Sequence, residues 1–133
     1  MSTDINKAAI RQYVDAFNRG DWQTMQKLFA DDAVVYGVLG WGRLNDVLPT
    51  WIRLHEALQM KLEVVDLVAE GHSVALRLNE SGRAVGQFFH HPATGKTYEA
   101  VAMEWFELRN GLITRRWGAR DSAGIYRQLG YTA

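Results

Sequence analysis

The chain has 133 residues, and its 15 Lys and Arg balance its 15 Asp and Glu, so the formal net charge is zero. A nucleic-acid-binding protein normally carries a surplus of positive charge, so the balance argues against that class. The absence of Cys excludes disulfides, thiolate nucleophiles and Cys-based zinc sites.

The length predicts a single domain spanning residues 1–133. Residues 1–7 are polar, and no apolar stretch follows that would serve as a signal sequence. No stretch approaches the roughly 18 apolar residues of a membrane span. A cytoplasmic protein without membrane contact is therefore expected.

The first half of the chain predicts three helices and one strand. Apolar residues recur at helical spacing over residues 5–20, and a second, shorter helix is expected over residues 21–32. Residues 33–39 are β-branched and apolar, which predicts a strand that enters a bend made by the glycines of residues 37–42. The third helix is expected over residues 46–58.

In the second half the hydrophobic period changes from 3.6 to 2. This pattern predicts strands at residues 62–68, 74–78, 84–89 and 98–109. Asn110-Gly111 is the strongest short hairpin signal in a sequence, and it joins the long strand to a last strand at residues 112–121. A helical tail is expected over residues 122–129. Helices followed by antiparallel strands predict an α+β domain in which one sheet face wraps the helices.

The last hairpin places charges on an otherwise apolar face. If the two residues that flank Asn110-Gly111 pair directly, counting fixes the register of the whole hairpin. One face is then apolar or small except for Glu104, Arg115 and Asp121, with Glu104 opposite Trp117 and diagonal to Arg115. Charges beside alanines on an apolar face are typical of a polar site in a pocket.

Two interpretations of these charges remain open. Two carboxylates in a partly apolar cavity can have different pKa values, so that one acts as an acid while the other stays ionised. Alternatively, Glu104 and Arg115 form a structural ion pair, and Asp121 caps the final helix.

Further candidates lie on the predicted helices. Tyr13 and His55 each occupy the apolar face of a helix, and Trp51 lies one turn from His55, so all three could reach the same cavity. For each of them, a place in the core is the more frequent outcome. His90 and His91 are adjacent in a loop with no carboxylate or third His at ligand spacing, so no metal site is expected.

The other face of the hairpin is also apolar. It carries Val101, Met103 and Trp105, with Arg116 and Arg120 as charged neighbours. An apolar patch on the exposed side of a sheet is usually covered, which predicts a homodimer through this surface.

Several motifs, in order along nearly the whole chain, resemble a known superfamily. Residues 13–21 (Tyr-Val-Asp-Ala-Phe-Asn-Arg-Gly-Asp) and 28–35 (Leu-Phe-Ala-Asp-Asp-Ala-Val-Val) are similar to the cone-shaped α+β superfamily that includes nuclear transport factor 2, ketosteroid isomerase and SnoaL-like polyketide cyclases. The later motifs resemble the SnoaL-like branch, often called ester cyclases: residues 66–71, 92–96, 111–113, Trp117 with Asp121, and residues 127–130.

The resemblance implies a cone with three N-terminal helices packed in a strongly curved, mostly antiparallel sheet. It also implies aldol-type ring closure of a polyketide methyl ester without metal or cofactor, with an aspartate on the last strand, here Asp121, as acid/base. Tyr13 and Glu104 resemble the two enolate-binding donors of ketosteroid isomerase. Gly37, beside Tyr36, stands where that enzyme has its catalytic base, which argues against steroid isomerisation.

Together these observations predict a cofactor-independent acid/base enzyme that acts on a flat, apolar, carbonyl-bearing molecule. Asp121 would move the proton, and Glu104 and Tyr13 would stabilise the oxyanion. The expected substrate-binding residues are Trp51, His55, Tyr36, Trp117 and Arg115. The alternatives are a non-catalytic small-molecule-binding protein, or an isomerase, epoxide hydrolase or hydroxylase on the same fold.

Overall fold

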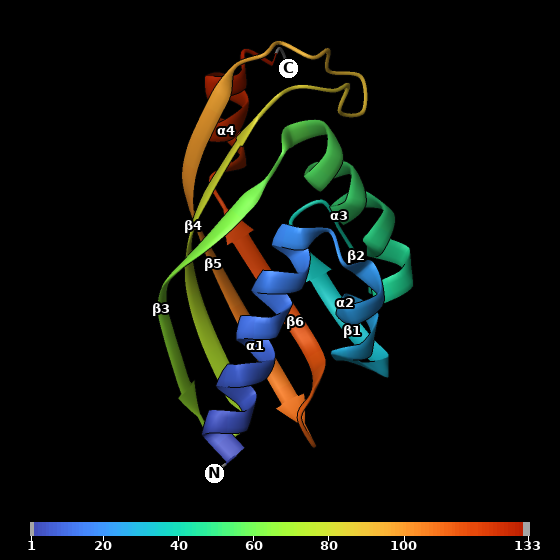
Figure 1. Cartoon of the computed structure of the whole chain (residues 1–133), viewed down its shortest axis with the longest axis vertical. Helices are drawn as coiled ribbons and strands as arrows, with labels where there is room; N and C mark the ends of the chain where they lie inside the picture. Colours follow the sequence, from blue (N-terminus) through green and yellow to red (C-terminus); the bar gives the residue numbers. More distant parts are fainter. Residues whose placement is uncertain (1, 132–133) are drawn as a thin grey trace.

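The computed structural model describes residues 2–131, so residue 1 and residues 132–133 of the expected domain lie outside the described range. The elements in chain order are α1 (Ser2–Arg19), α2 (Trp22–Lys27), β1 (Phe29–Gly37), β2 (Gly40–Arg43), α3 (Leu44–Leu58), β3 (Lys61–Glu70), β4 (Ser73–Arg83), β5 (Thr97–Arg109), β6 (Leu112–Arg120) and α4 (Ser122–Leu129) (Figure 1). No helix in this range is long and apolar enough to cross a membrane.

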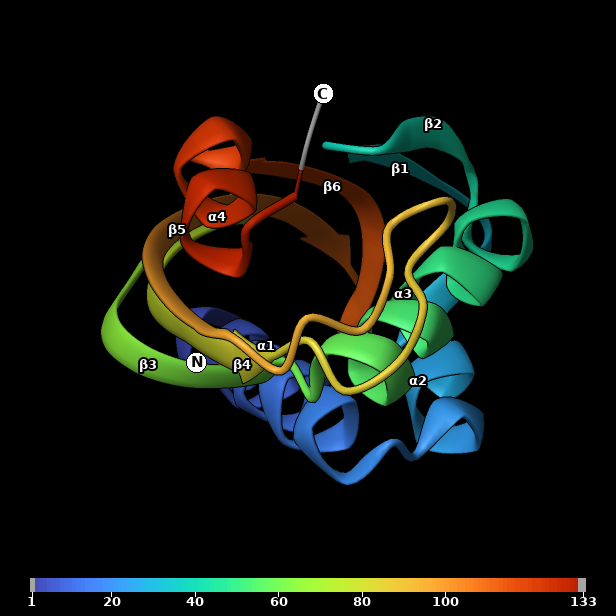
Figure 2. The ribbon, with the colours of Figure 1, turned by 90° about the horizontal axis from the view of Figure 1, so that it is seen from above.

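The six strands form one sheet in the order β2-β1-β6-β5-β4-β3. Neighbouring strands are antiparallel except for β1 and β6, which run parallel. Seen from above, the sheet curls around an interior that α1 and α3 close on the other side (Figure 2). The predicted α+β cone with a curved, mostly antiparallel sheet is confirmed.

The second helix and the first strand meet earlier than predicted. The helix α2 ends at Lys27, and β1 begins at Phe29. Phe29 pairs with Ile113 of β6, whose N–H donates to the carbonyl of Leu28 at 2.9 Å. Tertiary pairing with β6 therefore ends the helix. The glycine-rich bend is also a true hairpin, because β1 pairs with β2 from residue 34 to residue 43.

The strand predicted at residues 84–89 is wrong. Apart from an isolated bridge between Phe88 and His91, the segment is a loop. The N–H groups of Val85 and Gly86 both donate to the carbonyl of Ala57 near the end of α3, at 2.9 and 3.0 Å. These donors stabilise a helix end, so they are not available to a sheet.

The last hairpin contains a β-bulge that sequence counting missed. The turn is as predicted, because Asn110 and Gly111 both have positive φ, and Leu108 pairs with Ile113. The next pair, however, is Glu107 with Arg115, so Thr114 has no paired residue on β5. Its hydroxyl donates to the carbonyl of Glu107 at 3.0 Å. One extra residue exchanges the two faces of β6 beyond this point.

Candidate active site

A cavity lies between α1, α3, the β1–β2 hairpin and the inner face of strands β4 to β6. Aromatic side chains from three elements pack together beside it: the Tyr13 ring of α1 lies 5.0 Å from Phe106 of β5 and 6.0 Å from Trp51 of α3. Its polar lining residues are Tyr13, Asp46, Thr50, Glu80, Glu104, Arg116 and Arg120. An apolar space with a few convergent polar groups is the usual form of a small-molecule site.

The first polar group in the cavity is an ion pair between Glu104 and Arg116. Glu104 Oε2 accepts a hydrogen bond from Arg116 Nη2 at 2.7 Å, and the two residues are only 8% and 7% exposed. The bulge in β6 turns Arg116 inward, and its guanidinium carbon lies 5.2 Å from the ring centroid of Trp51, which allows a cation–π contact.

Glycine at position 118 makes room for this ion pair. A Cβ at Gly118 would lie 2.7 Å from Arg116 Nη1 and 2.8 Å from Arg116 Nη2. The guanidinium therefore rests on the bare backbone of β6, opposite Glu104, with which Gly118 pairs across the sheet.

Tyr13 adds a neutral hydrogen-bond donor beside the ion pair. Burial raises the pKa of the Tyr13 phenol above its usual range, with Arg116 opposing this shift and Glu104 adding to it. Burial lowers the pKa of Arg116, but Glu104 and Tyr13 together raise it by more, so its pKa lies above the usual range and the guanidinium stays charged. The site thus presents a phenol, a cation and a carboxylate together.

A second buried ion pair lines the same cavity. Glu80 Oε2 accepts from Arg120 Nη1 at 2.9 Å and from the hydroxyl of Tyr98 at 2.6 Å. Glu80 is 1% exposed. Burial raises the pKa of Glu80 above its usual range; the Arg120 charge and the Tyr98 hydrogen bond oppose this shift, and the Glu104 carboxylate adds to it.

Each ion pair leaves hydrogen-bonding capacity unused. Among the described residues, Glu80 Oε1, Glu104 Oε1, Arg116 Nε and Arg120 Nε are buried without a hydrogen-bond partner. Most buried polar groups in proteins are satisfied, so each of these groups calls for an explanation. The four residues that carry these two acceptors and two donors all line the same cavity.

Comparison with known proteins assigns the chain to a family. The sequence profile of the SnoaL-like polyketide cyclases matches residues 7–129. The chain belongs to this family.

Two relatives illustrate how this SnoaL-like chain compares with others. It is 26% identical to the aklanonic acid methyl ester cyclase DnrD of Streptomyces peucetius, over 98% of this chain and 92% of that protein. IdmH of Streptomyces antibioticus, a candidate polyketide cyclase of solved structure, is 27% identical, with a TM-score of 0.85 over 94% of this chain and 98% of IdmH.

An epoxide hydrolase shares the fold alone. The LEH-like epoxide hydrolase of M. tuberculosis superposes with a TM-score of 0.78 over 97% of this chain and 92% of that chain, at 16% sequence identity. At this identity, the likeness carries no information on the reaction.

Three of the predicted site residues of this SnoaL-like chain line the cavity, namely Tyr13, Trp51 and Glu104. Asp121 does not belong to that lining. It follows the end of β6 and caps α4, where its Oδ1 accepts from the N–H of Gly124 at 2.9 Å. Of the two interpretations drawn from the sequence, the structure places Asp121 as the helix cap.

The bulge moves two other predicted residues out of the cavity. The prediction that Glu104 faces Arg115 is wrong, because Arg116 takes that place; Arg115 is exposed, with Nη1 3.9 Å from Glu107 Oε1. Trp117 stacks on Tyr36, with ring centroids 5.1 Å apart and planes at 13°. Neither Trp117 nor Tyr36 lines the cavity.

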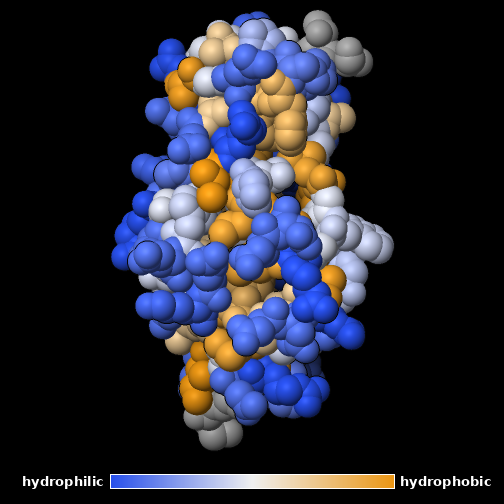
Figure 3. Space-filling view, turned by 90° about the vertical axis from the view of Figure 1, so that its right-hand side faces the viewer, coloured by the Kyte–Doolittle hydropathy of each residue, from blue (hydrophilic) through white to orange (hydrophobic). Residues whose placement is uncertain are grey.

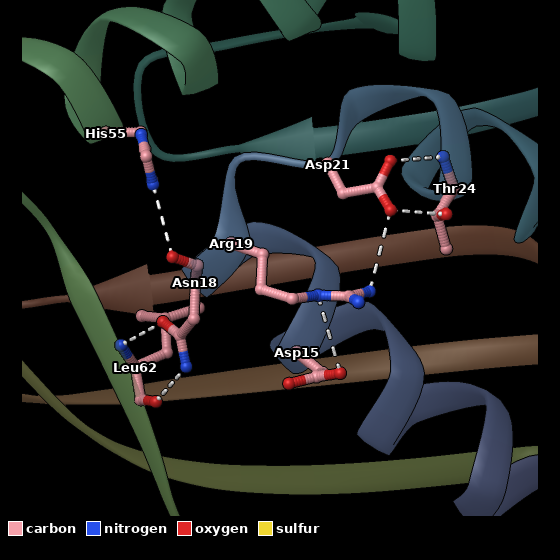
Figure 4. A network of polar contacts seen from close by, with 7 residues as sticks. All are labelled: Asp15, Asn18, Arg19, Asp21, Thr24, His55 and Leu62. Atoms are coloured by element: carbon pink, nitrogen blue, oxygen red, sulfur yellow. Dashed lines mark hydrogen bonds and ion pairs between the residues drawn. The ribbon is translucent and has the colours of Figure 1, made fainter.

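His55 also lies elsewhere, among the helices. Its Nε2 is 3.3 Å from the carbonyl oxygen of Asn18, and its ring meets Phe17 and Trp22 edge to face. The side chain of Asn18 bonds to both the N–H and the carbonyl of Leu62, each at 2.8 Å (Figure 4). His55 therefore belongs to the contacts that join α1, α3 and β3.

Sequence reasoning missed Arg116, Glu80 and Arg120. Glu80 carried a usable signal, because it continues the alternation of Val74, Leu76 and Leu78, whose side chains are buried. Arg116 and Arg120 carried none, because their orientation depends on the bulge. Within residues 2–131, no three His, Cys, Asp or Glu side chains are grouped to hold a metal ion.

Apolar side chains of the β1–β2 hairpin surround part of the cavity. Val38, Leu39 and Trp41 line it, and all three are exposed, Trp41 at 76%. On the side of the molecule that α2, α3 and β2 occupy, apolar surface forms a vertical band between hydrophilic margins (Figure 3).

The raised pKa of Glu80 predicts a pH dependence of stability. A carboxyl whose pKa is higher in the folded state stabilises the fold below its unfolded pKa, and this stabilisation is lost as pH rises through the folded pKa. We therefore expect the melting temperature of the wild-type chain, relative to that of Glu80→Gln, to fall as pH rises above the ordinary Glu pKa of 4.5. Thermal unfolding followed by circular dichroism measures this difference, and a difference independent of pH would contradict it.

Proposed function

We propose that this protein is a cofactor-independent cyclase that closes a ring in a flat, carbonyl-bearing polyketide ester by acid/base chemistry. The observation that carries the proposal is the inner end of the cavity, where Glu104, paired with Arg116 through one oxygen, has its other oxygen without a partner among the described residues. The name of the relative DnrD, a methyl ester cyclase, supports the substrate class.

The proposed reaction is an aldol-type isomerisation. Glu104 accepts a proton from the carbon between two carbonyl groups, and the enolate oxygen that forms accepts hydrogen bonds from Tyr13 and Arg116. The enolate carbon then attacks a second carbonyl carbon of the same molecule. A carbon–carbon bond forms, and protonated Glu104 returns its proton to the alkoxide, so the product has the composition of the substrate.

These roles differ from those expected from the family resemblance. Asp121 was expected to move the proton, but it caps α4 outside the cavity lining. Glu104 was expected to donate a hydrogen bond, but a carboxylate paired with Arg116 is an acceptor. We therefore assign proton transfer to Glu104 and oxyanion stabilisation to Tyr13 and Arg116, with Trp51 as a wall for the ligand.

The decisive experiment is mass spectrometry of an aromatic diketone methyl ester after incubation with the protein. A product of unchanged mass and new retention time supports the cyclase. A gain of one water from an added epoxide would instead indicate an epoxide hydrolase, and a gain of one oxygen would indicate a hydroxylase. Binding without any conversion would indicate a non-catalytic small-molecule-binding protein.

We also propose a homodimer through the outer face of the sheet. Val68, Val101, Met103 and Trp105 are each about half exposed or more there. The bulge turns Arg116 and Arg120 away from this face, so it is more apolar than the sequence predicted, and an apolar patch of this kind favours association. We expect the wild type to sediment as a dimer at micromolar concentration and Met103→Lys to sediment as a monomer; a monomeric wild type would contradict the proposal.

A further inference from the structure

Glu80, Arg120 and Tyr98 form a polar cluster that the proposed reaction does not use. Glu80 and Arg120 line the same cavity as Glu104 and Arg116 but lie farther along the strands. Arg116 and Arg120 are four residues apart on β6, which separates their Cα atoms by about 13 Å. Between the two ion pairs, the cavity wall carries the small residue Ala102, which leaves room for a flat ligand, and Gly118, on which the Arg116 guanidinium rests.

Stability alone does not account for this cluster. Removing two charges from water is costly, and a buried ion pair is often no more stabilising than apolar side chains of similar volume. The cluster is also incompletely satisfied, because Glu80 Oε1 and Arg120 Nε have no hydrogen-bond partner among the described residues. A costly polar cluster with unused capacity at a cavity wall indicates ligand binding.

We propose that Glu80 and Arg120 bind a hydroxyl group of the ligand. The two unpartnered atoms are one acceptor and one donor, and a hydroxyl group both donates and accepts. A carbonyl or ether oxygen could satisfy only Arg120, and a carboxylate would be repelled by Glu80. The ligand is thus a neutral molecule with a carbonyl at the Glu104 end and a hydroxyl at the Glu80 end. Only the placement of the carbonyl rests on the proposed function.

A matched pair of probes tests the hydroxyl site without turnover. Acetophenone and para-hydroxyacetophenone differ by one hydroxyl, placed at the far end of the ring from the carbonyl. We expect the wild type to bind the hydroxylated probe about tenfold more tightly, since a buried hydrogen bond to a charged group is worth that much or more. Titrations followed by calorimetry and by the nuclear magnetic resonance signals of the Trp side chains measure both affinities.

The key variant is the double replacement Glu80→Met with Arg120→Met. It keeps the side-chain volume and leaves no unpaired charge, so we expect it to fold, and its two probe affinities should be equal within about twofold. Glu80→Gln keeps the shape and removes only the charge, so its preference should be intermediate. The matched control is Asp15→Met with Arg19→Met, which replaces an exposed ion pair on α1 and should leave the preference unchanged.

Equal affinity of the wild type for the two probes would overturn the hydroxyl site, and so would failure to bind either probe. A preference retained in the Glu80→Met, Arg120→Met variant would also overturn it. If that variant does not fold, an unchanged preference in Glu80→Gln overturns it instead. A hydroxyl preference with no ring closure would leave this inference standing and remove only the proposed reaction.

Discussion

Glu104→Gln should lower the turnover of an aromatic diketone methyl ester by about 10²–10⁴-fold, the usual effect of removing a general base. Gln retains an oxygen that can accept from the Arg116 guanidinium, so the contact becomes a hydrogen bond between a cation and a neutral amide of the same shape. Loss of the countercharge lowers the stability of the fold, so rates are compared at a temperature at which the variant is fully folded. Because the ground-state contacts persist, KM should change much less than kcat. Initial rates followed by chromatography, with circular dichroism to verify folding, measure the effect.

The matched control for this prediction is Asp121→Asn. The Asn oxygen can still accept from the N–H of Gly124, so α4 remains capped, and the variant changes only a carboxylate outside the cavity lining. We expect its turnover to stay within a few-fold of the wild type. The reverse result, a large loss in Asp121→Asn with Glu104→Gln fully active, would return the acid/base role to Asp121.

The second large effect concerns stability. Arg116→Met should lower the free energy of unfolding by about 3–5 kcal/mol, because it leaves the Glu104 carboxylate buried without its partner. Adding Glu104→Met should recover most of that loss, since a buried ion pair replaced as a whole by apolar residues is often neutral. Urea unfolding of both single variants and the double variant completes the cycle.

An exposed ion pair provides the control for this cycle. Asp15 and Arg19 pair one turn apart on α1, with both side chains more than half exposed. Arg19→Met should therefore cost no more than about 1 kcal/mol, the usual limit for surface ion pairs. If Arg116→Met and Arg19→Met cost the same, Glu104 does not depend on Arg116 in the folded protein.

The class of fold and most of its elements could be predicted from the sequence alone. The change of period from 3.6 to 2 near the middle of the chain predicted helices before strands, because side-chain spacing on each element is set by backbone geometry. Asn110-Gly111 predicted the last turn correctly, because a two-residue hairpin turn requires positive φ at both positions and this requirement is local. Tyr13, Trp51 and Glu104 were found for the same reason, as polar or aromatic groups on apolar faces.

Which charges share the cavity depends on the pairing of the strands in three dimensions, which the sequence did not predict. One extra residue at Thr114 replaces Arg115 by Arg116 on the inner face and turns Arg120 inward. Local residue propensities do not predict this bulge, because it is fixed by how β6 pairs with β5. Counting along the hairpin predicted Asp121 at the end of the last strand, but in the structure Asp121 is the N-cap residue of α4. The balanced set of 15 basic and 15 acidic residues thus includes two buried Glu–Arg pairs. Composition could not reveal them, because strand pairing determines which side of the sheet each charge faces.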